Sequence, residues 1–112
     1  MEIHFQGRKL EKACMNQSQR TRTYGPVCGK QLEYRLSDLK DAENLDAMRL
    51  RPQAKCHELA GDRKGTLAIS LKQPYRLIFE PAHHLVPRKP DGGLDWTQVT
   101  AICILAVEDY HD

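Results

Sequence analysis

The sequence predicts an α+β fold in which two N-terminal helices pack on a small, mostly antiparallel sheet. In the first half of the chain, apolar residues recur at the helical period. In the second half they alternate with polar residues, as they do in half-buried strands. The chain has 112 residues, and this length favours one domain over residues 1–112. The predicted order is strand, helix, helix and then three strands, written β-α-α-β-β-β.

The composition, 40% hydrophobic and 29% charged, is typical of a soluble globular protein. No run reaches the roughly 18 apolar residues of a membrane span, and no charged segment followed by an apolar run indicates a signal peptide. The four cysteines contain no C-x-x-C pair, which favours a reduced, cytoplasmic protein. Two disulfides in a secreted chain are the alternative. The net charge of +2 does not by itself indicate a nucleic-acid binder.

The N-terminal half contains the predicted first strand and both helices. Residues 1–6 place Ile3 and Phe5 on one face if they are extended, although the letters FQG also resemble the remnant of a cleaved cloning tag. A helix over residues 8–16 is followed by a polar connection that ends before Pro26. The longer second helix begins there and carries apolar residues at helical spacing, namely Cys28, Leu32, Leu36 and Leu39.

The C-terminal half predicts an antiparallel meander of three strands against the helices. Alternation over residues 67–71 and 75–80 indicates the first two. Residues 99–110 are apolar on both faces, so this third strand is expected inside the sheet. The segment 81–98 between the last two strands is rich in proline and glycine and is expected to be a long loop.

Five residues near the ends of these strands form a chemically coherent set: His57, Arg76, Asp109, Tyr110 and His111. Metal-independent RNA cleavage needs a base for the ribose 2′-OH, an acid for the leaving 5′ oxygen and cations for the phosphate. Two histidines can divide the proton transfers, and arginine matches phosphate oxygens with its forked donors. A tyrosine can stack on a base. Convergence of the two histidines depends on sheet twist and on the loop that carries His57.

Each of these residues also has a plain structural interpretation. His57 is equally consistent with polar surface, and Arg76 with an ion pair to Glu80 or Asp62. Tyr110 can simply cover the end of the sheet. No ligand spacing indicates a metal site.

Four segments resemble the HigB branch of the RelE/ParE toxin superfamily, the plasmid maintenance system killer proteins. They are RKLEKAC, HELAGDRKGTLAISL, PYRLIFEPA and VTAICILAVEDYHD, and together they span nearly the whole chain. The resemblance implies the family's fold, a small sheet packed against two helices. It also implies a toxin of a type II toxin–antitoxin system that cuts mRNA on the ribosome as an endoribonuclease, without metal or cofactor.

Carried over by motif, His57 is similar to the family's histidine before the glycine-aspartate turn, and Arg76 to its strand arginine at the scissile phosphate. Asp109, Tyr110 and His111 resemble its closing catalytic residues. The resemblance implies that the two histidines transfer protons, that Tyr110 orients or stacks and that Asp109 tunes a neighbour. Which histidine is the base stays open.

Basic residues extend the expected site toward RNA. Arg63 and Lys64 lie on a turn whose glycines serve mainly its geometry, and they are expected, with Arg49 and Arg51, to bind RNA or phosphate. Further candidates for ribosomal RNA contact, against the alternative of a solvated surface, are Arg20, Arg22 and Lys55. The loop at 81–98 is longer than the tight hairpin common in the superfamily. It offers either an extra ribosome contact through Arg88 and Lys89 or a mobile, solvated segment.

Two other functions remain open on the same fold. One is a ParE-like toxin that binds DNA gyrase without enzymatic activity. The other is a weak toxin that acts mainly as co-repressor with its antitoxin. The expected partners are a HigA-like helix-turn-helix antitoxin, the ribosome and mRNA, with operator DNA reached only through the antitoxin and no membrane involved.

Overall fold

The computed structural model describes residues 1–109 and has an α+β fold, as predicted. Its sheet has five strands in the order β1-β5-β4-β3-β2, with β1 parallel to β5 and every other neighbouring pair antiparallel. The strands are β1 (Glu2–Phe5), β2 (His57–Glu58), β3 (Leu67–Ser70), β4 (Tyr75–Pro81) and β5 (Ala101–Asp109). The meander of β3, β4 and β5 is confirmed, and β5 is flanked by strands on both sides.

Three α-helices, not two, precede the meander, so the predicted element order is wrong in this respect. They are α1 (Arg8–Met15), α2 (Gln17–Tyr24) and α3 (Pro26–Asp41), and the two-residue strand β2 was not predicted either. Helix α2 occupies the segment expected to be a polar connection. Asn16 caps its N-terminus: the Asn16 side chain accepts a hydrogen bond from the Gln19 backbone N–H at 3.0 Å.

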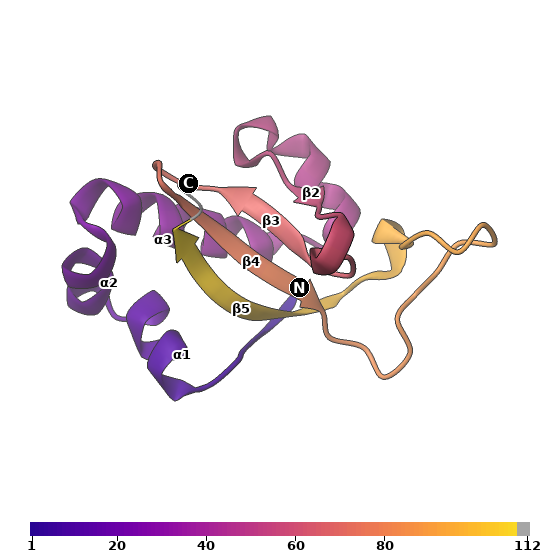
Figure 1. Cartoon of the computed structure of the whole chain (residues 1–112), viewed down its shortest axis with the longest axis horizontal. Helices are drawn as coiled ribbons and strands as arrows, with labels where there is room; N and C mark the ends of the chain where they lie inside the picture. Colours follow the sequence, from indigo (N-terminus) through magenta and orange to yellow (C-terminus); the bar gives the residue numbers. More distant parts are fainter. Residues whose placement is uncertain (110–112) are drawn as a thin grey trace.

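The core lies between α3 and one face of the sheet. The predicted apolar stripe of α3 is buried there and packs in one cluster with alternate residues of the strands, among them Leu77, Phe79, Ile102 and Ile104. Figure 1 shows α3 running behind the sheet. The helices therefore cover one face, and the alternate strand residues point to the other, which we call the open face.

Short 3₁₀ helices complete the chain: η1 (Leu45–Leu50), η2 (Pro52–Ala54), η3 (Gly61–Arg63) and η4 (Trp96–Gln98). The segment between β4 and β5 is a long loop, as predicted, and it projects away from the sheet in Figure 1. An isolated bridge between Arg88 and Leu94 closes the tip of this loop, and Leu85 on it is 81% exposed.

Candidate functional site

The open face of the sheet carries a row of polar side chains near the end of β5. Ser70, Arg76 and Glu108 are register partners across β3, β4 and β5. Directly opposed residues of neighbouring strands point to the same face. Leu77, the neighbour of Arg76 along β4, belongs to the core, so Arg76 and its register partner Glu108 lie on the open face.

Two arginines converge on the Glu108 carboxylate. Arg76 donates from Nε to Glu108 Oε2 at 3.0 Å, and its Nη2 makes an ion pair with the same oxygen at 2.9 Å. Arg63 donates from Nη1 to the same oxygen at 3.2 Å and makes a close ion pair from Nη2 to Oε1. The side chains of Arg63, Arg76 and Glu108 keep 40%, 24% and 23% of their surface exposed, so solvent and ligands can reach the cluster.

The charges of this cluster stabilise one another. Hydrogen bonds from Arg63, and secondarily from Arg76, lower the pKa of Glu108 below its ordinary value of 4.5. The hydrogen bond to Glu108 likewise raises the pKa of Arg63. The Glu108 carboxylate is therefore ionised at neutral pH, and both guanidiniums pair with it.

The turn at η3 brings Arg63 over the open face. Gly61 and Gly65 have φ angles of 67° and 99°, which side chains disfavour, so the prediction that the glycines serve the turn is confirmed. Thr66 Oγ1 donates to the Arg63 carbonyl at 2.7 Å and fixes the backbone at this point. The turn thus positions Arg63 so that its guanidinium reaches Glu108.

His57 lies on the open face but away from this cluster. It is the register partner of Ala68, which is paired with Ile78, and Ile78 in turn with Ala106. Three inter-strand spacings separate His57 from β5, about 14 Å at the usual 4.8 Å per strand. The ring is exposed, and its Nδ1 lies 2.7 Å from the Lys55 carbonyl oxygen.

The closing motif is described only in part. Asp109 is the last residue of β5 and the register partner of Tyr75, one position beyond the Arg76–Glu108 pair. Tyr110 and His111 lie outside the described residues. The structure thus brings Arg63, Arg76 and Glu108 together at one end of the open face. Asp109, the next residue of β5, points to the opposite face, and His57 lies two strands from Arg76 and three from β5.

Several other predicted RNA-binding residues have partners within the protein. The Arg49 guanidinium lies over the Trp96 ring at 4.0 Å from its centroid and donates to Asp46 at 2.7 Å. Arg51 pairs with Asp38 at 3.4 Å. These contacts give Arg49 and Arg51 structural roles, whatever else they bind.

Arg20 differs most from the expectation of an RNA contact. It is buried, with 7% of its surface exposed, donates to the Cys14 carbonyl at 2.8 Å and pairs with Glu33 at 3.1 Å. These contacts fasten α2 to α1 and α3. The expectation that Arg20 belongs to an RNA-facing surface is wrong, because its guanidinium is part of the helical layer.

Sequence reasoning missed Glu108. The structural alternative to phosphate contact was an ion pair of Arg76 with Glu80 or Asp62, whereas Arg76 pairs with Glu108. The alternation of β5 does place Glu108 on one face with Ala106, but only the β4–β5 register identifies Arg76 as its neighbour. That register includes a bulge at Ile78 and Phe79, which sequence periodicity does not indicate.

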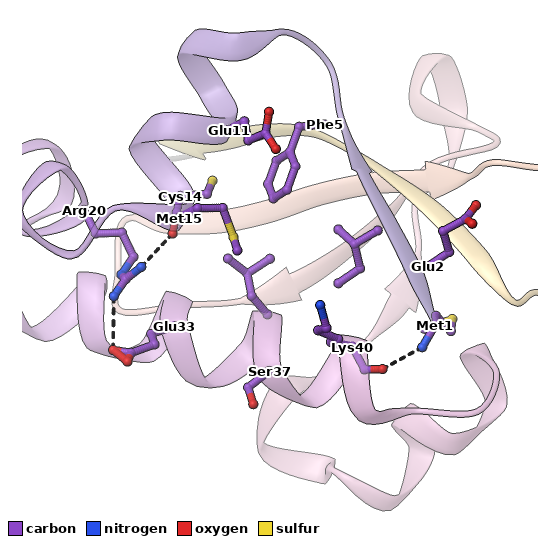
Figure 2. Close-up of a pocket in the computed structure, with 12 residues that line it drawn as sticks. Met1, Glu2, Phe5, Glu11, Cys14, Met15, Arg20, Glu33, Ser37 and Lys40 are labelled. Atoms are coloured by element: carbon purple, nitrogen blue, oxygen red, sulfur yellow. Dashed lines mark hydrogen bonds and ion pairs between the residues drawn. The ribbon is translucent and has the colours of Figure 1, made fainter.

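Two cavities lie next to other parts of the sheet, away from the cluster of Arg63, Arg76 and Glu108. One, of about 840 Å³, separates the long loop from the β2–β3 end of the sheet and is lined by Lys64, Thr66 and Arg88. The other, of about 560 Å³, lies between β1, α1 and α3 and is lined mainly by apolar side chains such as Ile3, Phe5 and Leu36 (Figure 2). Figure 2 also shows the hydrogen bonds of Arg20 that border this second cavity.

Within residues 1–109, no three histidine, cysteine, aspartate or glutamate side chains are grouped as metal ligands. No helix in the same residues is long and apolar enough to cross a membrane.

Comparison with known proteins does not assign the chain to a family. No family model matches the chain, and a search of curated proteins finds no match. The resemblance to HigB-like toxins therefore stays a prediction, supported by the motifs.

Proposed function

We propose that this chain is a HigB-like toxin of the RelE/ParE superfamily that cleaves mRNA on the ribosome and so inhibits translation. The observation that carries the proposal is the convergence of Arg63 and Arg76 on the open face at Glu108, the first residue of the closing EDYH sequence. Two guanidiniums at one accessible point provide the donors that a phosphodiester needs. The gyrase-binding alternative does not require such a site.

In the proposed mechanism, different residues bind the phosphate and transfer the protons. Arg63 and Arg76 hold the scissile phosphate and neutralise the charge that develops on it. Proton transfer is assigned first to the closing motif, whose His111 follows Asp109 by two residues in the sequence. His57, about three strand spacings away, is assigned to a neighbouring nucleotide.

The experiment is controlled expression of the chain with and without a HigA-like antitoxin, followed by mapping of 5′ ends in cellular transcripts. New ends inside translated messages are expected when the toxin is expressed alone. Arg76→Ala is expected to lower cleavage by about 10²-fold or more, as loss of a charge-stabilising donor does. Arg8→Ala, at an exposed arginine on α1, is the matched control and is expected to cleave normally.

Two outcomes would contradict the proposal. Growth arrest with intact transcripts would remove the nuclease function, and DNA breaks without mRNA cleavage would favour gyrase binding. Circular dichroism of each purified variant separates loss of activity from loss of folding.

The division of roles gives a separate prediction. His57→Ala is expected to reduce cleavage less than Arg76→Ala does, because its ring lies away from the two arginines. Equal losses in the two variants, measured by the same mapping of 5′ ends, would show that His57 acts at the scissile phosphate after all.

A further inference from the structure

We propose that Glu108 is a built-in competitor for RNA: its carboxylate occupies the phosphate site formed by Arg63 and Arg76 and must leave when a phosphodiester binds. This inference rests on the proposed function for its substrate class, a single-stranded RNA phosphate. It goes further by assigning a role to Glu108.

The geometry supports occupation of the site. Both carboxylate oxygens of Glu108 are engaged, Oε1 by Arg63 and Oε2 by Arg63 and Arg76. The contacts join residues 45 and 32 positions apart in the chain, so they depend on the tertiary fold. All three side chains remain partly exposed, which lets a ligand exchange with the carboxylate.

The chemistry makes this occupation competitive. A carboxylate and a phosphodiester both carry one negative charge and present a pair of oxygens to a guanidinium fork. A phosphodiester that bound the same guanidinium edges would replace Glu108 without changing the charge balance. The Glu108 side chain would then turn toward solvent, which its 23% exposure already allows.

A second interpretation of the cluster is purely structural: Glu108 fastens η3 to β5 and does nothing else. The two interpretations predict opposite effects of Glu108→Gln on RNA binding. If Glu108 only holds η3 to β5, its loss would leave Arg63 less ordered, and RNA binding would weaken or stay unchanged. A lost competitor would remove the carboxylate charge that phosphate must displace from the two guanidiniums, and would strengthen binding.

The test measures binding of a short single-stranded RNA in which every ribose is 2′-O-methylated, so that it cannot be cleaved. Fluorescence anisotropy on the full chain gives the dissociation constant at several salt concentrations. For Glu108→Gln we expect about tenfold tighter binding, which equals about 1.4 kcal/mol. We also expect the slope of log K against log salt to steepen, because the site of Glu108→Gln carries one more net positive charge than that of the wild type.

Glu80→Gln is the matched control, because it removes the same charge from a strand carboxylate of β4 outside the cluster. It is expected to bind RNA with little change. In the Glu108→Gln background, Arg63→Ala or Arg76→Ala is expected to abolish the gain. Glu108→Asp keeps the charge but shortens the reach, so it is expected to give a smaller gain and serves if Glu108→Gln unfolds.

Several results would overturn the inference: unchanged or weaker binding by Glu108→Gln, an equal gain in Glu80→Gln, or no measurable binding by any variant. Failure of the proposed function is a different result, because this assay requires no cleavage. Tighter binding by Glu108→Gln in a protein that cuts no mRNA would leave the inference standing and remove the nuclease. Cleavage of mRNA by a protein in which Glu108→Gln does not tighten RNA binding would leave the nuclease function standing and overturn the inference about Glu108.

Discussion

Trp96 joins three parts of the chain through one side chain. Its indole Nε1 donates to Glu58 Oε2 at 2.9 Å, and the Arg49 guanidinium covers its ring at 4.0 Å. Trp96 therefore connects η4, at the end of the long loop, with β2 and η1. The sequence analysis counted Arg49 among the RNA contacts because it is a basic residue, and nothing local indicated the distant indole.

This arrangement predicts the effect of Trp96→Phe. The change keeps an aromatic ring but removes the donor to Glu58, and we expect a loss of about 1–2 kcal/mol in the free energy of unfolding. Urea denaturation followed by circular dichroism measures it. Arg49→Lys, which keeps the charge but not the planar stacking group, is expected to lose less. An unchanged urea midpoint in Trp96→Phe would show that the hydrogen bond contributes nothing net.

Glu108 predicts a specific acid dependence. Its pKa is lowered in the folded protein by Arg63 and Arg76, so its contribution to stability is fully present above the ordinary value of 4.5. That contribution is lost as pH falls from about 4.5 through the lower folded-state pKa. Glu108→Gln is therefore expected to lose less stability than the wild type between pH 5 and 3. Thermal unfolding across this range measures it, and equal slopes in both proteins would contradict the prediction.

At the level of elements, the sequence predicted those whose apolar residues follow one period. Helix α3 and strands β3, β4 and β5 were found because burial imposes a regular pattern on them. Helix α2 was missed because its sequence, QSQRTRTY, has no apolar stripe, and its one buried residue is a charged arginine. Arg20 attaches α2 to α1 and α3 through its hydrogen bonds, in place of the apolar contacts that the sequence pattern of α2 lacks.

The packing of α2 on α3 predicts the outcome of Gly29→Val. A Cβ at position 29 would lie 3.3 Å from the backbone carbon and oxygen of Arg20, so the side chain of valine would push the helices apart. We expect a loss of about 1–3 kcal/mol in unfolding free energy, although valine is the better helix former. Urea denaturation measures it.

Ser37→Val, at an exposed position of the same helix, is the control for Gly29→Val and is expected to change the unfolding free energy little. If Gly29→Val were as stable as this control, the two helices would be able to separate at no cost.

At the scale of the whole molecule, the fold gives the sheet one covered face and one open face. The sequence predicted this layering, because alternation in β4 separates core residues from Arg76. It did not predict how Arg63 reaches β5. In a flat meander the start of β3 and the end of β5 lie at opposite ends, and only the return of the η3 turn over the open face joins them. Such convergence depends on loop geometry rather than on periodicity.

Burial of the thiols predicts how the whole molecule responds to alkali. Burial raises the pKa of Cys14 and of Cys56 from 9.0 to about 12. Above pH 9 these thiols therefore ionise in the unfolded chain before they do so in the folded one. Each is expected to lower the unfolding free energy by about 1.4 kcal/mol per pH unit, up to about pH 12.

Urea denaturation between pH 8 and 10.5 measures this slope. Cys14→Ala and Cys56→Ala lower stability at every pH through the cavity they leave, but each is expected to flatten the alkaline slope. The dependence of unfolding free energy on pH therefore reports ionisation of the thiol, whereas the stability at a single pH also contains the effect of the cavity. Measuring both separates the two effects in one variant. A wild-type slope retained in both variants would mean that these thiols ionise as readily in the folded protein as in the unfolded chain, and that the core around Cys14 admits water.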